Sequence, residues 1–159
     1  MADQGNDVHV CFVCSGNICR SPMAALIFRE ELRRAGLDGV ARVSSAGLGP
    51  WHAGEPADPR ASRTLAAAGY PTDHVATQVG PEHIGADLLV AMDSGHEDAL
   101  LRMVDDPNRV RMLRSFDPTA KGEDQDIPDP YFGGRKGFTE LLAMLQAAMP
   151  GLLDWVRTG

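Results

Sequence analysis

A cysteine and an arginine six positions apart lie in a short loop near the start of the chain. Cys14 ends an apolar run, and Arg20 follows a turn in which Gly16 allows a positive φ and Asn17 tolerates one. Neither of the other two cysteines has an arginine at this spacing. A helical pattern follows directly, so backbone N–H groups and the helix dipole can converge on one anion. The loop therefore predicts a phosphate-binding site with a thiol at its base.

Each residue type in this loop suits phosphoryl transfer. A thiol at a helix N-terminus beside a cation ionises readily, so Cys14 is the predicted nucleophile. Arg20 offers a planar pair of donors to two phosphoryl oxygens, and Ser21 can donate a hydrogen bond to the departing sulfur. The remaining predicted phosphate-binding residues are Ser15, Gly16, Asn17, Ile18 and Cys19. The ordinary alternative is a buried strand-end cysteine, a surface arginine and a serine N-cap.

An acidic segment, residues 117–129, supplies candidates for a proton donor. Phosphoryl transfer that expels a leaving group of high pKa needs a general acid. Asp129 is the preferred candidate because Pro128 and Pro130 flank it and fix its backbone. Asp126 is the second candidate, and the other carboxylates are interpreted as solvated.

Strands and helices alternate along the chain around these residues. Apolar runs predict strands at 8–13, 41–45, 87–92 and 109–113. Helical periodicity and capping residues predict helices at 21–36, 58–69 and 94–104, with Ser94 as a cap, and a final helix over 141–156 that Pro150-Gly151 should disturb. This order predicts an α/β three-layer fold: a four-stranded, mostly parallel sheet with helices on both faces and the phosphate-binding loop after the first strand. Ligands bind at the carboxyl ends of such strands, where Cys14 lies.

Composition restricts the class of protein and its partners. With 159 residues, 43% of them hydrophobic, the chain is expected to form a single domain over residues 1–159. The net charge of −7 argues against nucleic acid and anionic membranes as partners. No apolar run approaches ~18 residues and the start shows no signal peptide, so we expect a cytoplasmic protein. As a separate expectation, the protein is a monomer or a weak dimer. No residue spacing suggests a metal site, so we expect no metal and no cofactor.

The loop sequence resembles the signature of low-molecular-weight protein-tyrosine phosphatases, and most closely their actinobacterial members. The residues that carry the resemblance are Val13-Cys14-Ser15-Gly16-Asn17-Ile18-Cys19-Arg20-Ser21-Pro22, followed in order by Ser44-Ser45-Ala46-Gly47, Trp51, Gly69-Tyr70-Pro71, His74, Met92-Asp93 and Asp129-Pro130-Tyr131. The resemblance implies hydrolysis of phosphotyrosine through a phosphocysteine intermediate. It implies tyrosine-phosphorylated proteins as partners, and inorganic phosphate or a similar oxyanion as a ligand of the loop.

The resemblance also implies roles for residues outside the loop. It places the general acid at Asp129 and a supporting hydrogen-bond network at Asn17, Ser45 and His74. Asp93 is interpreted as a helix-capping or structural residue, and the same structural interpretation is given to His9, His52, His83 and His96.

Loop aromatic residues are expected to select the substrate. Trp51, Tyr131 and Phe132 are predicted to form an apolar slot that admits a phenyl ring and holds a short phosphoserine too far from Cys14. The family usually has a second tyrosine where this chain has Phe132, so regulation through that hydroxyl is absent. Similar arginine phosphatases have Thr at the position of Ile18, so this residue favours phosphotyrosine.

A redox role is predicted for Cys14 and Cys19. The curled loop is compatible with the ~4.4–6.8 Å between Cα atoms that a disulfide needs. The resemblance implies that Cys19 captures the sulfenic acid formed when peroxide oxidises Cys14. The alternative is that Cys19 is a small packing residue at the start of the helix.

Three other functions compete with this interpretation. Arsenate reduction occurs on the same fold with the same loop, but it needs two further cysteines, and none follows Cys19. A phosphotyrosine-binding module without turnover would not need Cys14, Arg20 and Asp129 together. A redox or metal protein built on Cys11 and Cys14 is disfavoured because residues three apart on a strand point to opposite faces.

Overall fold

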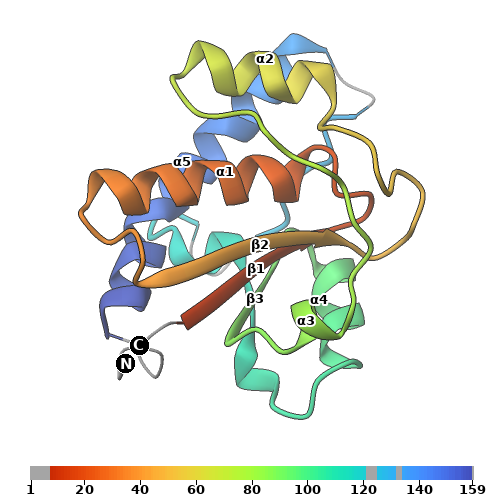
Figure 1. The fold of residues 1–159 in the computed structure, drawn as a ribbon, viewed down its shortest axis with the longest axis vertical. Helices are drawn as coiled ribbons and strands as arrows, with labels where there is room; N and C mark the ends of the chain where they lie inside the picture. Colours follow the sequence, from red (N-terminus) through yellow and green to blue (C-terminus); the bar gives the residue numbers. More distant parts are fainter. Residues whose placement is uncertain (1–7, 121–124, 132–133, 159) are drawn as a thin grey trace.

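The sheet has four strands, and every pairing between them is parallel. The computed structural model describes residues 8–120, 125–131 and 134–158. The strand order is β2-β1-β3-β4, with β1 at Val8–Cys14, β2 at Ala41–Gly47, β3 at Leu88–Ala91 and β4 at Val110–Met112 (Figure 1). The predicted α/β fold is therefore confirmed, with a wholly parallel sheet.

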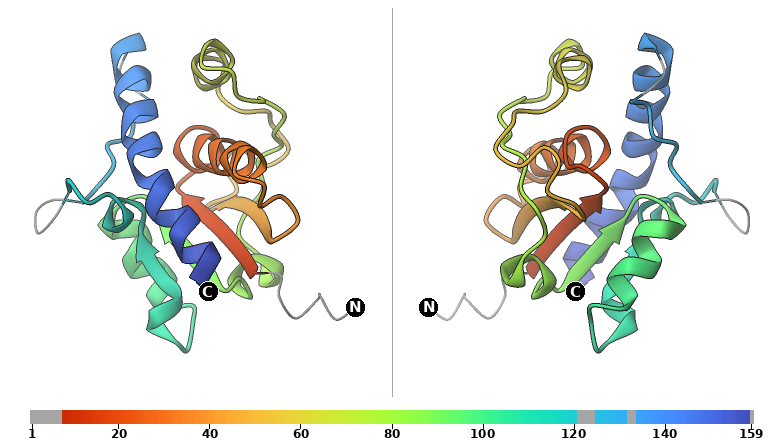
Figure 2. Two further views of the ribbon diagram at one scale, coloured as in Figure 1. Left: turned by 90° about the vertical axis from the view of Figure 1, so that its left-hand side faces the viewer. Right: turned by 90° about the vertical axis from the view of Figure 1, so that its right-hand side faces the viewer.

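Helices cover both faces of the sheet, which makes three layers. Their bounds are Arg20–Arg34 for α1, Pro59–Ala67 for α2, Pro81–Ile84 for α3, Ser94–Leu101 for α4 and Arg135–Thr158 for α5. Two 3₁₀ turns, η2 at Pro107–Arg109 and η3 at Leu113–Phe116, flank β4. α1 and α5 lie on one face and α3 and α4 on the other (Figures 1 and 2). The short α3 has no counterpart among the predicted helices.

Side chains of β1 alternate between two hydrophobic cores. Val10 and Phe12 pack with α1 and α5, whereas Cys11 and Val13 belong to the core on the other face. Cys14 belongs to the first core, so Cys11 and Cys14 lie on opposite faces of the strand as predicted. Cys11 is fully buried, which fits a packing role.

Aspartate side chains cap the starts of α2 and α4, and the second cap corrects the sequence prediction. Asp58 caps α2 as predicted, since its side chain accepts the backbone N–H of Arg60 at 2.8 Å. The cap of α4 is Asp93 rather than Ser94: an Asp93 carboxylate oxygen accepts the backbone N–H of His96 at 2.9 Å. Gly36, at φ 73°, follows the last turn of α1.

The prediction that Pro150-Gly151 disturbs the final helix is wrong. α5 continues through Pro150, and the buried Met149 and Leu152 hold it against the core on both sides of the proline. Gly151 has a packing role instead, because a Cβ there would lie 2.4 Å from the carbonyl oxygen of Phe116. Among the described residues, no helix is long and apolar enough to cross a membrane.

Candidate active site

Cys14 lies at the base of a pocket at the carboxyl end of β1. The pocket has a volume of about 210 Å³, and both the loop after β1 and the helix that follows contribute to it. The Cys14 sulfur accepts the backbone N–H of Asn17 at 3.3 Å and lies 3.0 Å from the Ser21 hydroxyl. These contacts hold the sulfur where the loop curls around the start of α1.

Asn17 connects the loop to the rest of the fold. It is the one non-glycine residue with positive φ, 61°, among those the structure describes. Its side-chain amide donates to the hydroxyls of Ser21, at 2.8 Å, and Ser45, at 3.0 Å. Because the Ser21 oxygen accepts from Asn17, its own proton is available to Cys14.

Two further contacts hold Asn17 from the opposite side. His74 Nε2 donates to the Asn17 carbonyl at 2.7 Å, and the backbone N–H of Thr77 donates to Asn17 Oδ1 at 2.9 Å. Burial lowers the pKa of His74, although the bond to the Asn17 carbonyl acts in the opposite direction. The structure thus brings Asn17, Ser45 and His74 together, and it adds Thr77, whose backbone role leaves no signal in the sequence.

Small residues let other segments approach the loop closely. At Gly47, the last residue of β2, a Cβ would lie 2.9 Å from the Ser15 carbonyl oxygen. Gly16 does not adopt the positive φ that the sequence suggested. Its lack of a side chain instead makes room for the His52 ring, whose Cδ2 would lie 2.9 Å from an added Cβ.

Arg20 is buried and held on one side by two acceptors. Its Nη1 donates to Asp93 Oδ2 at 3.0 Å and to the Ile127 carbonyl at 2.9 Å. Its Nη2 lies 3.7 Å from Asp129 Oδ2. The guanidinium is therefore fixed in the pocket wall, with Nη2 directed towards the side where Asp129 lies.

Asp93 also links the loop to α4 through His96. Ser15 Oγ lies 2.9 Å from His96 Nε2, and His96 Nδ1 lies 3.3 Å from Asp93 Oδ1. Burial lowers the pKa of His96 to about 4, although the Asp93 charge acts in the opposite direction, so the ring is neutral at pH 7. In the neutral tautomer that carries its proton on Nδ1, the nitrogen nearer Asp93, Nε2 accepts a hydrogen bond from the Ser15 hydroxyl.

Sequence reasoning assigned His96 and His52 no part in the site, and the structure places both against it. The available signal for His96 was its position three residues after Asp93, in the first turn of a helix that follows a strand end. His52 lines the pocket, and its ring centroid lies 6.5 Å from that of Tyr131. His9 and His83 lie elsewhere, bonded to the Ser44 hydroxyl and the Gly80 backbone.

The two candidate acids occupy different positions. Asp129 lines the pocket with Cys14 and Arg20, and its Oδ1 accepts the backbone N–H of Tyr131 at 3.0 Å. Asp126 Oδ1 accepts the backbone N–H of Ser94 at 2.8 Å, so this carboxylate is directed to the start of α4.

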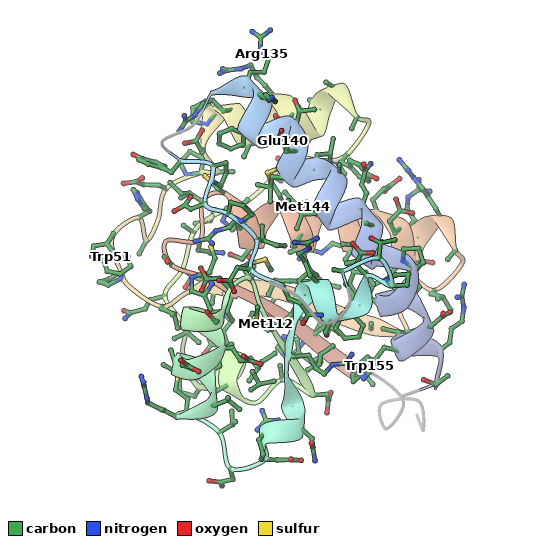
Figure 3. The ribbon with its side chains drawn as sticks, turned by 180° about the vertical axis from the view of Figure 1, so that it is seen from behind. Trp51, Met112, Arg135, Glu140, Met144 and Trp155 are labelled. Carbon is green, nitrogen blue, oxygen red and sulfur yellow. The ribbon has the colours of Figure 1, made fainter. Side chains whose placement is uncertain are left out.

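Aromatic and aliphatic side chains form the outer pocket. Ile18, Trp51 and Tyr131 line it, and Trp51 is 66% exposed. Figure 3 shows Trp51 projecting from the edge of the molecule. The third predicted aromatic, Phe132, lies outside the described residues.

Cys19 lines the same pocket but is buried. Burial raises the pKa of its thiol to about 12, and the charges of Asp58 and Asp129 act in the same direction. The three cysteines are all unbridged. Among residues 8–120, 125–131 and 134–158, no three His, Cys, Asp or Glu side chains are grouped as a metal site requires.

Comparisons with known proteins identify relatives over nearly the whole chain. The model of the low molecular weight phosphotyrosine protein phosphatase family matches residues 9–158. The low molecular weight protein-tyrosine phosphatase A of Mycobacterium tuberculosis is 54% identical over 149 residues, which cover 94% of this chain and 91% of that protein. A low molecular weight protein-tyrosine-phosphatase of Streptomyces coelicolor is 52% identical over 152 residues, 93% of each chain.

Solved structures show the same fold. A protein tyrosine phosphatase from Entamoeba histolytica superposes with a TM-score of 0.88 at 28% identity, covering 96% of this chain and 98% of that one. An arginine phosphatase from Geobacillus stearothermophilus superposes with a TM-score of 0.80 at 31% identity, covering 95% and 94%.

Proposed function

Because the chain belongs to the low molecular weight phosphotyrosine protein phosphatase family, we propose that it hydrolyses phosphotyrosine in proteins through a phosphocysteine intermediate. The proposed phosphatase domain spans residues 1–159 and acts in the cytoplasm without a metal or cofactor. The observation that carries the proposal is the position of the Cys14 sulfur, in one pocket with Arg20 and Asp129 and within hydrogen-bond distance of Ser21.

In the first proposed step the Cys14 thiolate attacks phosphorus and the phenolic oxygen leaves. Backbone N–H groups of residues 15–20 and the Arg20 guanidinium bind the phosphoryl oxygens. Asp129 gives its proton to the phenolic oxygen as the P–O bond breaks. The ion pair with Asp93 supports this step because it fixes the arginine before substrate binds.

In the second proposed step water attacks the phosphocysteine and the sulfur leaves as a thiolate. Asp129, now ionised, takes the proton from that water. Ser21 donates its hydrogen bond to the sulfur as negative charge develops there. Asn17 orients Ser21 for this task. Its side-chain amide donates a hydrogen bond to Ser21 Oγ, so the hydroxyl proton of Ser21 is free to point at the sulfur.

The outer pocket supports a preference for aryl phosphates. Ile18, Trp51 and Tyr131 provide apolar walls for a phenyl ring, while Cys14 lies at the base. A phosphoserine side chain is too short to place its phosphate at the base while its backbone stays outside. The proposed order of kcat/KM is phosphotyrosine first, then phosphoserine and phosphoarginine; a preference for phosphoarginine would contradict the interpretation of Ile18.

Replacement of the nucleophile tests the proposed function. Cys14→Ser should abolish hydrolysis of a phosphotyrosine peptide and of p-nitrophenyl phosphate, and should retain binding of the peptide. Cys11→Ser, which changes a core thiol on the other face of β1, is the matched control and should stay active. Activity that survives in Cys14→Ser, or that a chelator removes from the wild type, contradicts the proposal. Binding of the peptide by the wild type without phosphate release would indicate a binding module.

A further inference from the structure

A second cavity lies beside the catalytic pocket, between α2 and the first turns of α5. Its volume is about 650 Å³, roughly three times that of the catalytic pocket. Figure 2 shows α2 end-on beside this end of α5, above α1. We call it the arginine groove, because Arg60, Arg63 and Arg135 line it.

The groove combines positive charge with an apolar floor. Leu142 of α5 and Ala67 and Ala68 at the end of α2 contribute accessible apolar surface above the buried Phe138, and the described lining residues include no carboxylate. Arg63 and Arg135 are exposed, and Figure 3 shows Arg135 at the end of the molecule where α5 begins. Three arginines around one groove are notable in a chain with a net charge of −7. Because Asp58 pairs with Arg60, the charges that the groove offers to a ligand are those of Arg63 and Arg135, and these favour anions.

Arg60 connects the groove to the catalytic pocket. Its guanidinium lies 5.4 Å from the ring centroid of Tyr131, which lines the catalytic pocket, and 4.9 Å from that of Phe138 in the groove. Asp58 holds it in this position through an ion pair of 2.9 Å. A polypeptide whose phosphotyrosine enters the catalytic pocket beside Tyr131 can therefore pass over Arg60 into the groove.

We propose that the arginine groove binds an acidic segment of the substrate protein, adjacent in sequence to the phosphotyrosine. Arg63 and Arg135 pair with its carboxylates, for which guanidinium offers two parallel donors. Leu142 and Ala68, which are partly exposed, contact an apolar side chain of the same segment. Two observations favour an acidic segment of the substrate as the ligand. The arginines are complementary to carboxylates, and the contact of Arg60 with Tyr131 places the groove next to the catalytic pocket. This inference rests on the proposed function and specifies its substrate class.

Paired peptides test the groove separately from the catalytic pocket. Two phosphotyrosine peptides, identical except for Glu or Gln at the positions flanking the phosphotyrosine, are compared with the wild type and with Arg63→Glu/Arg135→Glu. The wild type should show a kcat/KM about 3- to 10-fold higher for the Glu peptide, and added salt should reduce this ratio. The double variant should lose or reverse the preference. Its hydrolysis of p-nitrophenyl phosphate, which is too small to reach the groove, should not change.

A charge-matched variant controls for the change in net charge. Arg102→Glu/Arg157→Glu alters two exposed arginines, at the end of α4 and at the far end of α5, and should keep the wild-type preference. The inference is overturned if the wild type does not discriminate between the peptides, or if the groove variant discriminates as the wild type does. It is also overturned if sedimentation shows a dimer that only the groove variant disrupts, because the groove would then join two copies of this chain. Failure of the wild type to hydrolyse any aryl phosphate would instead contradict the proposed function.

Discussion

At the scale of single residues, a chain of hydrogen bonds connects the Cys14 sulfur to residues distant in sequence. His74 and Thr77 hold Asn17, which in turn orients Ser21, so Asn17 links the sulfur to one segment, residues 74–77, that is distant in sequence. The pairing of Cys14 with Arg20 could be predicted from the sequence because both residues belong to one short loop. Thr77 contributes a backbone N–H and His52 contacts a glycine, and neither contact depends on a residue type that a motif would reveal.

The role of Asp129 is tested by the leaving group. Asp129→Asn should lower kcat/KM by roughly 100-fold or more for phenols of high pKa, and far less for activated aryl phosphates, because only the former need the proton. The measurement is a series of aryl phosphates of increasing leaving-group pKa. Asp126→Asn is the matched comparison and should behave like the wild type, since Asp126 is bonded to the start of α4. An equal loss across the series in Asp129→Asn would point to a structural role.

The redox prediction concerns Cys14 and Cys19. We expect peroxide to oxidise the Cys14 thiolate to a sulfenic acid. The Cys19 sulfur should then attack this sulfur, forming a disulfide and releasing water, and dithiothreitol should reverse the inactivation. Burial raises the pKa of Cys19, so disulfide formation should accelerate as the pH rises above neutrality. Cys19→Ser should keep most of its turnover but lose reversibility. Peptide mass spectrometry that finds no Cys14–Cys19 link after mild oxidation would refute the prediction.

At the scale of secondary-structure elements, the connection between β3 and α4 organises the site. Asp93 caps α4 and fixes Arg20. The Met92 carbonyl accepts the backbone N–H of Ile127, two residues before Asp129. Ser94 binds Asp126 in the same connection. Burial disfavours ionisation of Asp93, but the hydrogen bonds that its carboxylate accepts from the His96 backbone N–H and from Arg20 hold its pKa below the usual value. One short connection thus positions both Arg20 and the segment that carries Asp129.

His96 should act as a positioning residue through Ser15. His96→Ala removes the acceptor of the Ser15 hydroxyl and should lower kcat roughly tenfold, as expected for a lost buried hydrogen bond. His96→Asn, whose amide can accept from Ser15, should recover part of the loss. In the double variant with Ser15→Ala the two effects should not add. Additive effects, or a loss seen only in thermal stability, would assign His96 a structural role alone.

Elements were predictable from the sequence to the extent that their signals are local. Apolar runs located all four strands, and Asp58-Pro59 located the start of α2. The contact between Ser15 and His96 depends on β3 pairing with β1, and strand order is a property of the whole sheet rather than of either segment. The continuity of α5 through Pro150 likewise depends on packing against the core, which local propensity does not report.

At the scale of the whole molecule, buried histidines couple folding to pH. Burial lowers the pKa of His9, His74 and His96 below the ordinary 6.5, to about 4 for His96. In all three cases the unfolded chain binds more protons than the folded chain as the pH falls below 6.5. Stability is therefore full above pH 6.5 and declines towards pH 4.

Denaturation at two pH values tests this coupling. Between pH 7 and pH 4.5 the free energy of unfolding should fall by on the order of 1–3 kcal/mol through His96 alone. His96→Asn should show a smaller difference between the two pH values than the wild type in urea titrations. The pKa of Asp93 is lowered from its ordinary 3.8, so its contribution to stability is lost only below pH 3.8 and does not change between pH 7 and pH 4.5. An identical pH dependence in the two proteins would contradict the assignment to His96.

The covalent intermediate on Cys14 is the central claim, and mass spectrometry after rapid mixing and quenching tests it most directly. The wild type is mixed with an aryl phosphate, quenched within a turnover and digested. We predict a single phosphoryl group per protein, on the peptide that contains Cys14, appearing together with the first equivalent of phenol. In Cys14→Ser, no phosphoryl group that forms and is hydrolysed during turnover should be found on this peptide. Steady turnover without an adduct, or an adduct on any other residue, would contradict the account.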